Sequence, residues 1–291
     1  MKPAPCVLHA PRTIAEVVAL LGSVTNAQLL AGGQSLMPML NMRLVAPDNL
    51  IDLNRIDELS YIREEQGEIV MGAMTRQRDI EYSALVAKRL PLMTEAMLNV
   101  GHRQTRNRGT LGGSLCHLDP SAEMPAIMMA YDATMVTQSA RAGRSLPMSA
   151  FARGLMTTAL EAGEMLTQIR IRPWGMGHGW CFVEFARRHG DFAVVSAAAL
   201  IELDSDRRVA RAALTLGGVG PTPFRVASAE AVLVGASGEA QFREASALAA
   251  DCEALDDPAF PAWYRQRIAT KLLTRAIAGA FARAQQRHEV T

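Results

Sequence analysis

The stretch TLGGSLCHLDPSAEMPA, Thr110–Ala126, contains two adjacent glycines, two serines, a cysteine, a histidine and two acids. These residue types fit three kinds of site: a metal centre, a nucleophile, or a loop that holds an anion. From Asp119 onward the stretch predicts a helix, because aspartate favours the N-cap, proline follows at the first helical position, and apolar residues recur at helical spacing. The preceding arginine-rich segment, residues 101–114, lacks a helical period and is predicted to be a loop.

A metal centre or a nucleophile is the weaker interpretation of this stretch. Cys116 and His117 are adjacent, so on a strand their side chains would point to opposite faces. Zinc would need at least one further ligand from elsewhere in the chain. Neither Ser114 nor Cys116 has a base and an acid at a known spacing, and no two of the four cysteines stand at a zinc or iron–sulfur spacing. We therefore predict no metal ligand and no acid–base catalytic residue.

A second glycine-rich loop, LLAGGQSLMPML at Leu29–Leu40, favours the anion-binding alternative. Two glycines follow a predicted strand there, and their missing side chains let backbone N–H groups turn inward as an anion nest. The loop matches neither the dinucleotide fingerprint nor a P-loop, and each glycine pair alone also fits a tight turn. Two such loops in one chain suggest a diphosphate held between two nests. Arg103, Arg106 and Arg108 would either balance its charge or lie in a solvated loop.

The apolar pattern of the first part of the chain predicts a strand–loop–helix–strand unit. Residues 14–21 form the helix, with Thr13 as its cap and Gly22 at its end, and strands are expected at 27–33 and 49–54.

A second part follows the first, and a third follows a boundary at Arg172–Gly179, which holds one proline and three glycines. The third part opens with strand-like segments and ends in alanine-rich helices, the last at about 261–286. The elements predicted for the second part are strands at 68–75, 133–138 and 164–171 and helices at 77–86 and 91–100.

Composition excludes several classes of function. The chain has 291 residues, of which 49% are hydrophobic, enough for the cores of two domains. Thirty Lys and Arg residues nearly balance 29 Asp and Glu residues, so charge offers no case for binding nucleic acid or an anionic membrane. No apolar run approaches the roughly 18 residues of a transmembrane helix, and the N-terminus lacks a signal-peptide core. We predict a cytoplasmic protein with no membrane span.

Three motifs together resemble the FAD-binding medium subunit of molybdenum hydroxylases: AGGQSLMPMLNMRL, RNRGTLGGSLCHLDPSAEMPA and ARRHGDFA. This is the family of xanthine dehydrogenase, carbon monoxide dehydrogenase and the bacterial N-heteroaromatic hydroxylases, and the resemblance covers nearly the whole chain. It implies an α+β fold with a vanillyl-alcohol-oxidase-like FAD-binding domain at 1–175, in two α/β subdomains of about 1–57 and 58–175. It also implies a smaller C-terminal domain at 176–291, with an antiparallel sheet and helices.

The resemblance further implies where FAD is held. The two glycine loops would hold its diphosphate, the position matching Glu123 would lie beside the cofactor, Leu166 would pack near the flavin, and Gly190–Ala193 would approach the isoalloxazine. The residues predicted to bind FAD are Ala31, Gly32, Gly33, Gln34, Ser35, Leu36, Thr110, Gly112, Gly113, Ser114, Glu123, Leu166, Asp191 and Phe192.

Two positions depart from the common family pattern. Many relatives have asparagine in place of Ser114, and a hydroxyl has less reach and lacks the amide group. Many also have lysine in place of Glu184. We hypothesise that a negative charge there disfavours an anionic reduced flavin and shifts the choice of electron acceptor.

By resemblance, the chain is the electron-transfer subunit of an enzyme complex. A large subunit with a molybdopterin-type molybdenum cofactor would hydroxylate the substrate, with N-heteroaromatics favoured, and a small subunit would carry two [2Fe–2S] clusters. Electrons would pass through these clusters to FAD and then to an external acceptor, in a dimer of heterotrimers. Two alternatives stay open: a free-standing FAD-dependent oxidase or reductase of the same fold, and a non-enzymatic scaffold that has lost FAD.

Overall fold

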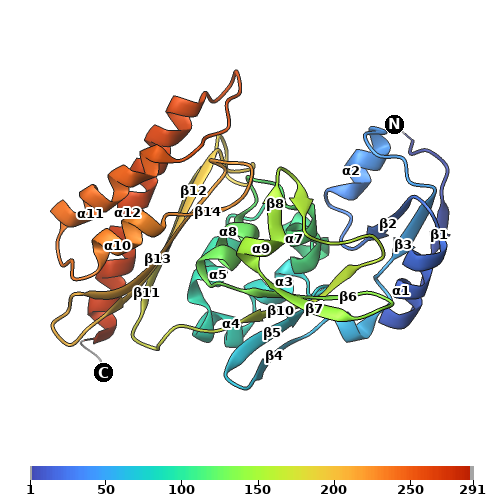
Figure 1. Ribbon diagram of the computed structural model, residues 1–291, viewed down its shortest axis with the longest axis horizontal. Helices are drawn as coiled ribbons and strands as arrows, with labels where there is room; N and C mark the ends of the chain where they lie inside the picture. Colours follow the sequence, from blue (N-terminus) through green and yellow to red (C-terminus); the bar gives the residue numbers. More distant parts are fainter. Residues whose placement is uncertain (1, 289–291) are drawn as a thin grey trace.

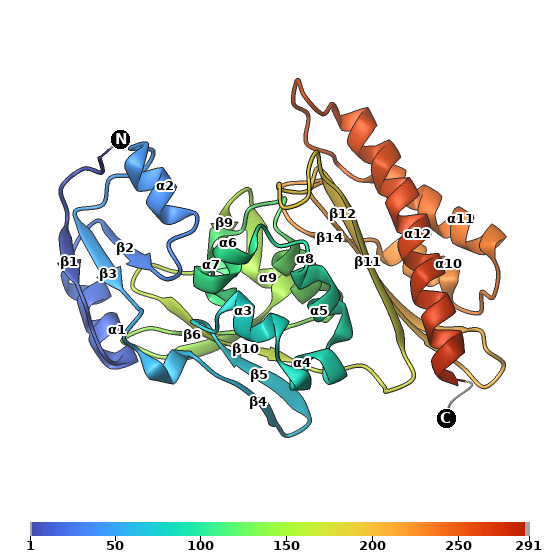
Figure 2. The same ribbon diagram turned by 180° about the vertical axis from the view of Figure 1, so that it is seen from behind.

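The computed structural model describes residues 2–288 and shows three parts arranged in a row (Figure 1). The N-terminal part lies at one end and the C-terminal part at the other, with a larger middle part between them. The reverse view shows the same order (Figure 2). Within residues 2–288, no helix combines the length and the hydropathy needed to cross a membrane.

A parallel three-stranded sheet, in the order β1-β3-β2, forms the N-terminal part. The first helix is capped as predicted, because the Thr13 hydroxyl accepts a hydrogen bond from the Glu16 backbone N–H (3.2 Å). Val17 and Val18 bury its apolar face. The elements are β1 (Val7–His9), α1 (Ile14–Ser23), β2 (Ala27–Leu30), α2 (Leu36–Asn41), β3 (Asn49–Asp52) and the 3₁₀ turn η1 (Asp57–Leu59).

The middle part is built on an antiparallel five-stranded sheet in the order β4-β5-β10-β6-β7, with helices gathered on one face (Figures 1 and 2). The long helices predicted at 77–86 and 91–100 are three shorter ones, since the Ser83 hydroxyl caps a new helix. The elements are β4 (Ile62–Glu65), β5 (Glu68–Gly72), α3 (Gln77–Glu81), α4 (Ala84–Arg89), α5 (Pro91–Met97), α6 (Arg103–Arg108), α7 (Leu111–His117), α8 (Glu123–Ala130), β6 (Thr134–Gln138), β7 (Gly143–Pro147), α9 (Met148–Phe151), β8 (Ala152–Gly154), β9 (Thr157–Thr158) and β10 (Met165–Ile171).

The C-terminal part is an antiparallel sheet covered on its outer face by helices (Figure 1). The predicted strands and the predicted final helix are all present. The elements are β11 (Gly179–Phe185), β12 (Val195–Leu203), β13 (Val209–Gly217), β14 (Phe224–Arg225), α10 (Ala227–Leu233), α11 (Glu239–Ala247), the 3₁₀ turn η2 (Leu248–Asp251) and α12 (Ala262–His288).

The prediction of a loop at residues 101–114 is wrong, because the segment contains α6 and the start of α7. Arg106 is 9% exposed, and its guanidinium pairs with the Glu81 carboxylate (2.8 Å) and donates to the backbone carbonyls of Val100 and Gly101. A buried ion pair with a distant helix therefore holds this polar turn in helical form, and sequence periodicity carries no signal for such a contact.

The predicted helix start at Asp119 is also wrong, since α8 begins at Glu123. Leu118 ends α7 in the left-handed conformation (φ 50°). The Asp119 carboxylate then accepts a hydrogen bond from the Ser121 N–H (2.9 Å), and the Pro120 carbonyl accepts one from the Gly218 N–H (2.7 Å). Residues 119–122 form a turn attached to the C-terminal sheet.

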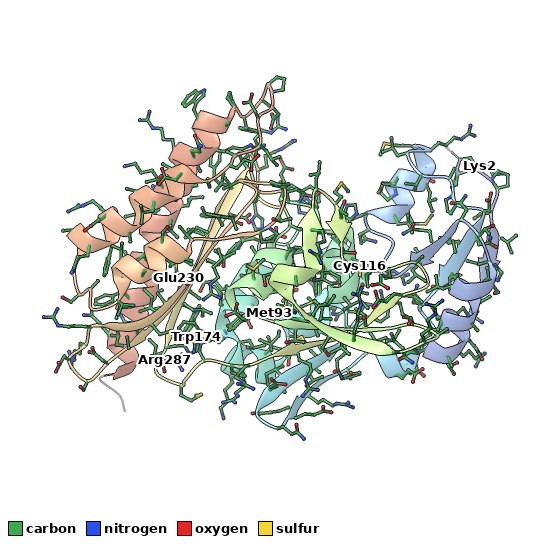
Figure 3. The ribbon with its side chains drawn as sticks, viewed as in Figure 1. Lys2, Met93, Cys116, Trp174, Glu230 and Arg287 are labelled. Atoms are coloured by element: carbon green, nitrogen blue, oxygen red, sulfur yellow. The ribbon has the colours of Figure 1, made fainter. Side chains whose placement is uncertain are left out.

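The middle and C-terminal parts share one hydrophobic core. Met93, which is fully buried near the centre of the molecule (Figure 3), belongs to the same cluster as Phe182 and Leu200 of the C-terminal sheet. The N-terminal part has a smaller cluster of its own, joined by Met74 and Met165. The N-terminal part is therefore attached to the rest by fewer apolar contacts, and the candidate site lies at this junction.

Candidate functional site

One cavity of about 850 Å³ lies where the three parts approach one another. Every residue predicted to bind FAD lines it, from the glycine loop after β2 to the segment between β11 and β12. Cys116, which Figure 3 labels, also lines this cavity, as do His117 and Asp119. The fold thus brings together segments that are far apart in the sequence, although whether each residue contacts a cofactor stays a prediction.

The first glycine loop presents unused hydrogen-bond donors to the cavity. Among residues 2–288, the backbone N–H groups of Gly32, Gly33, Gln34 and Ser35 have no acceptor. Gly33 adopts φ +74°, a conformation that glycine reaches without steric cost and that ends β2 in a tight turn. The Ser35 hydroxyl likewise has no partner in this part of the chain. The loop therefore has the donors that an anion nest requires.

The second glycine loop differs, because its donors are used within the protein. The N–H of Gly112 donates to the Ala73 carbonyl (2.8 Å), that of Gly113 to the Thr110 hydroxyl (3.1 Å), and that of Ser114 to the Thr110 carbonyl (3.2 Å). The two bonds to Thr110 form the first turn of α7, and the bond to Ala73 attaches this turn to the residues after β5. What this loop still offers is Ser114, which lines the cavity and whose hydroxyl has no hydrogen-bond partner among residues 2–288.

The glycines also let the two loops approach closely. A Cβ on Gly32 would lie 2.3 Å from the Arg108 carbonyl oxygen and 2.8 Å from the Gly109 Cα. A Cβ on Gly113 would lie 2.7 Å from the Thr110 hydroxyl and 3.5 Å from the Ala31 Cβ. Real Cβ atoms do not approach backbone atoms this closely, so Gly32 in particular is required for the contact between the loops.

Two acids stand near the loops with altered protonation. Glu123 is 4% exposed, and burial raises its pKa to about 8, with a further increase from the charges of Glu184 and Asp119 that a backbone hydrogen bond partly opposes. Burial also raises the pKa of Glu184 to about 7, and its Oε2 atom is buried without a partner within the described residues. Glu123 is therefore mostly neutral at pH 7 and can donate a hydrogen bond into the cavity.

Glu184 itself does not line the cavity. It acts on the site through electrostatic repulsion, because the negative charge of Glu184 raises the pKa of Glu123. Because its pKa lies near neutrality, the position carries only part of a negative charge at pH 7, which weakens the electrostatic contrast with lysine that the sequence suggests.

At another side of the cavity, Asp191 and Phe192 come from the turn between β11 and β12. Phe192 is 60% exposed, and Asp191 pairs with Arg188 (3.3 Å) on the surface. Leu166, on β10, is 4% exposed and points an apolar side chain at the same space. Leu166 thus gives the cavity a buried apolar surface, and Phe192 gives it an exposed aromatic ring.

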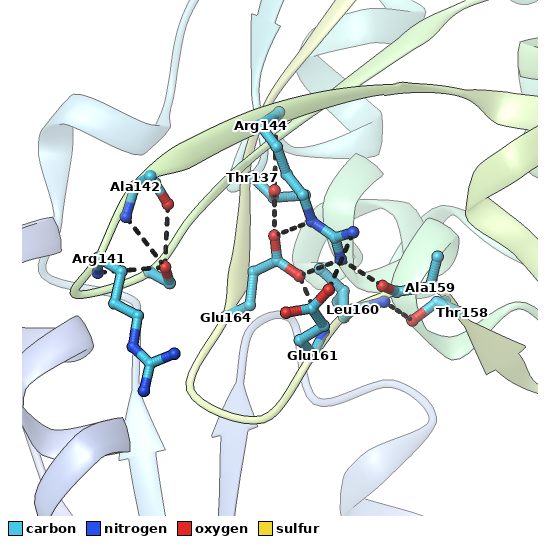
Figure 4. Close-up of polar contacts among 10 residues, drawn as sticks. Thr137, Arg141, Ala142, Arg144, Thr158, Ala159, Leu160, Glu161 and Glu164 are labelled. Carbon is cyan, nitrogen blue, oxygen red and sulfur yellow. Dashed lines mark hydrogen bonds and ion pairs between the residues drawn. The ribbon is translucent and has the colours of Figure 1, made fainter.

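Sequence reasoning missed the segment Leu160–Glu164, which also lines the cavity. Arg144 ties it in place, as Figure 4 shows: its guanidinium donates to Glu164 (2.6 and 2.7 Å) and to the Ala159 carbonyl (2.5 Å). Thr137 donates to the same carboxylate. These hydrogen bonds, with the Arg144 charge, lower the pKa of Glu164 to about 2. The sequence does carry a signal for this segment: a short loop with a glycine between two acids, Glu161 and Glu164, directly before a predicted strand.

The arginines considered as phosphate partners do not line the cavity. Arg106 is committed to Glu81, while Arg103 and Arg108 are exposed. Within residues 2–288 no group of three or more His, Cys, Asp or Glu side chains could hold a metal ion. Cys116 lies on a helix, and burial raises its thiol pKa to about 12, so it would not act as a nucleophile near neutral pH.

Two family models cover most of the chain. Residues 4–174 match the FAD binding domain in molybdopterin dehydrogenase, and residues 180–280 match the CO dehydrogenase flavoprotein C-terminal domain. The chain belongs to the family of FAD-binding medium subunits of molybdenum hydroxylases.

Relatives with assigned activities are similar along most of their length. The chain is 38% identical to the carbon monoxide dehydrogenase medium chain of Hydrogenophaga pseudoflava, over 94% of this chain and 96% of that one. It is 40% identical to the caffeine dehydrogenase subunit beta of Pseudomonas sp. strain CBB1, over 81% of this chain and 80% of that one.

Solved structures give the same result. A carbon monoxide dehydrogenase chain from Hydrogenophaga pseudoflava superposes with a TM-score of 0.94 at 38% identity, covering 97% of this chain and 99% of that one. A quinoline 2-oxidoreductase chain from Pseudomonas putida 86 gives 0.93 at 36% identity, over 98% of this chain and 99% of that one. The predicted α+β flavoprotein fold is confirmed.

The observed cavity fits FAD. A dinucleotide carries an anionic diphosphate between two ring systems, and the unused N–H groups at Gly32–Ser35 supply donors for such an anion. The neutral carboxyl of Glu123 and the free hydroxyl of Ser114 can donate hydrogen bonds to the diphosphate without adding charge repulsion. The apolar side chains of Leu29, Leu166 and Phe192 suit its rings.

Proposed function

We propose that this chain holds FAD as the electron-transfer subunit of a molybdenum hydroxylase. It would receive electrons from the [2Fe–2S] clusters of a small subunit and pass them to an external acceptor, while a large molybdopterin subunit hydroxylates the substrate. The observation that carries the proposal is one cavity that is lined by every residue predicted to bind FAD and has unused backbone donors on one side.

Bound FAD supplies the electron-carrying chemistry, and the residues of this chain hold it and set the charge around it. We infer that the loop Ala31–Leu36 binds the diphosphate through backbone N–H groups and that Thr110–Ser114 gives clearance and one hydroxyl. Leu166 would pack on the flavin, and Asp191 and Phe192 would lie at its exposed edge. The exposed ring of Phe192 suits a position where a partner subunit approaches, since aromatic side chains are enriched at interfaces.

We also propose the division of the chain and its setting. Residues 1–175 would bind the cofactor, with subdomains at about 1–57 and 58–175, and residues 176–291 would support the cavity from the side of β11 and β12. The complex would be a dimer of heterotrimers. A cytoplasmic location is supported by Cys6, Cys116, Cys181 and Cys252, which are all free thiols.

The decisive experiment is purification of the chain with its natural partners and, separately, alone. The proposal expects FAD at one per chain in both samples, with molybdenum, iron and substrate turnover only in the complex. Turnover of an organic substrate by the isolated yellow chain would favour a free-standing oxidase or reductase. Failure of the pure chain to bind added FAD would favour the scaffold alternative and overturn the proposal.

Glu184 is the position proposed to tune the flavin. Glu184→Lys replaces a partly ionised acid with a cation, so the flavin midpoint potential should rise. The check is spectroelectrochemical titration of the reconstituted chain, with Glu202→Lys as control, because Glu202 lies on β12 at the opposite end of the β11–β12 pair from Glu184. An unchanged potential in Glu184→Lys would refute the proposed influence.

A further inference from the structure

A polar connection crosses from the N-terminal part to the middle part just outside the cavity. Asn54 follows β3, and Arg76 precedes α3. Neither residue lines the cavity, and both are half-buried. They meet through a hydrogen bond from the Arg76 Nη2 to the Asn54 Oδ1 (2.6 Å).

Each of the two side chains also holds one glycine loop. The Asn54 amide donates to the Ala31 carbonyl (3.0 Å), where the first loop leaves β2. The Arg76 Nη1 donates to the Arg108 carbonyl, directly before the second loop. The path Ala31–Asn54–Arg76–Arg108 thus joins the two loops by side chains alone.

Further contacts on either side hold Asn54 and Arg76 in place. The Asp52 carboxylate accepts hydrogen bonds from the Asn54 backbone N–H (3.0 Å) and from its amide, which orients that amide. Arg76 pairs with Thr110 in an isolated antiparallel bridge, so the residue that carries the guanidinium is itself fixed to the second loop. The side chains of Asn54 and Arg76 can therefore fix the position of one loop relative to the other.

The contact that the path supports is the tight one at Gly32. A Cβ there would meet the Arg108 carbonyl oxygen, the same atom that accepts from Arg76. Few apolar contacts join the N-terminal part to the middle part, so this polar connection has more influence on loop separation than it would inside a shared core.

We propose that Asn54 and Arg76 form a brace that sets the separation of the two glycine loops and thereby the affinity for the FAD diphosphate. This inference rests on the proposed function. Both are positioning residues, because they act through Ala31 and Arg108 and lie outside the cavity. The brace would have no effect on a ligand that contacts only one of the loops.

The test measures FAD binding to the deflavinated full-length chain. Asn54→Ala and Arg76→Gln should each weaken FAD at least tenfold. The double variant should be no weaker than the weaker single variant, because both changes break one path. Arg78→Gln, which removes the same charge from an exposed position two residues away, should stay within twofold of the unchanged chain.

Two further measurements separate positioning from general destabilisation. The apo-protein variants should unfold within a few degrees of the unchanged chain, while the stabilisation that FAD adds should shrink. Arg76→Lys keeps the charge but cannot reach both the amide and the carbonyl, so it should bind FAD as weakly as Arg76→Gln. Full affinity in folded Arg76→Lys, or additive losses in the double variant, would overturn the brace.

The outcomes also distinguish the brace from the function on which it rests. If the unchanged chain binds no FAD, the proposed function fails. If it binds FAD and the brace variants bind equally well, only the brace is overturned.

Discussion

The two glycine loops of this protein each have a glycine pair closely followed by a serine, but they differ in structure. The first, AGGQS at Ala31–Ser35, leaves four successive backbone N–H groups without an acceptor in the described chain. The second, TLGGS at Thr110–Ser114, uses the corresponding groups to start a helix. The first loop keeps free donors and meets the second loop at Gly32, whereas Gly112 and Gly113 are required for the packing and the first turn of α7.

The difference shows that a glycine pair in a sequence can indicate either of two structures. Missing side chains permit an inward-facing N–H nest, but they equally permit a helix to begin against a neighbouring backbone. The hypothesis that both loops are backbone N–H nests is therefore wrong for the second loop, whose N–H groups have acceptors within the chain. On the side of the second loop, we expect the donors to be side chains such as the Ser114 hydroxyl and the neutral carboxyl of Glu123.

The largest effect is expected from Gly32→Ala. Its Cβ would lie 2.3 Å from the Arg108 carbonyl oxygen, so the loops must separate and the nest must distort. FAD affinity should fall about 1,000-fold, or about 4 kcal/mol, measured by flavin fluorescence titration of the apo-protein. Gly22→Ala is the matched control, since nothing lies within 4 Å of its Cβ. Retention of FAD in Gly32→Ala would mean that the loops need not touch.

A roughly tenfold effect is expected from pH, because ionised Glu123 would repel the diphosphate. FAD affinity should fall as pH rises through about 8, and Glu123→Gln should remove this dependence. The folded state raises this pKa, so it binds the proton more tightly than the unfolded chain. Apo-protein stability should thus decline between about pH 4.5 and 8, less so in Glu123→Gln. If the unchanged chain and Glu123→Gln showed the same dependence of FAD affinity on pH, Glu123 would not be the hydrogen-bond donor.

Gly113→Ala should weaken FAD about fivefold, well short of Gly32→Ala. The new Cβ would lie 2.7 Å from the Thr110 hydroxyl and disturb the cap of α7, a contact worth about 1 kcal/mol. Calorimetry of the apo-protein should show that loss of stability as well. If Gly113→Ala abolished FAD binding as fully as Gly32→Ala, the two loops would be equivalent after all.

The smallest effect is expected from Ser114→Asn, which introduces the residue that the family resemblance leads us to expect at this position. The amide adds a donor with longer reach on the side where backbone donors are used, so FAD should bind two- to threefold more tightly. Equilibrium titration at pH 7 measures it, with Ser35→Asn as a comparison on the donor-rich loop. Weaker binding in Ser114→Asn would show that the site is adapted to the smaller hydroxyl.

The sequence alone was sufficient for features that depend on short segments. Strands and helices with a clear period, such as 14–21 and 164–171, form as predicted, since their apolar faces are specified by neighbouring residues. The motifs indicated the family and the residues that line the cavity, because glycine, serine and acid types at those positions are local properties of the chain.

Only the tertiary structure decided how those residues are used. The helix at 103–108 depends on the buried pair of Arg106 with Glu81, and the late start of α8 depends on the bond from Gly218 to Pro120. The bond from the Gly112 N–H to the Ala73 carbonyl and the neutral state of Glu123 depend on distant neighbours in the same way. Hydrogen-bond partners and burial are set by the whole fold, so a local pattern cannot show which groups remain free.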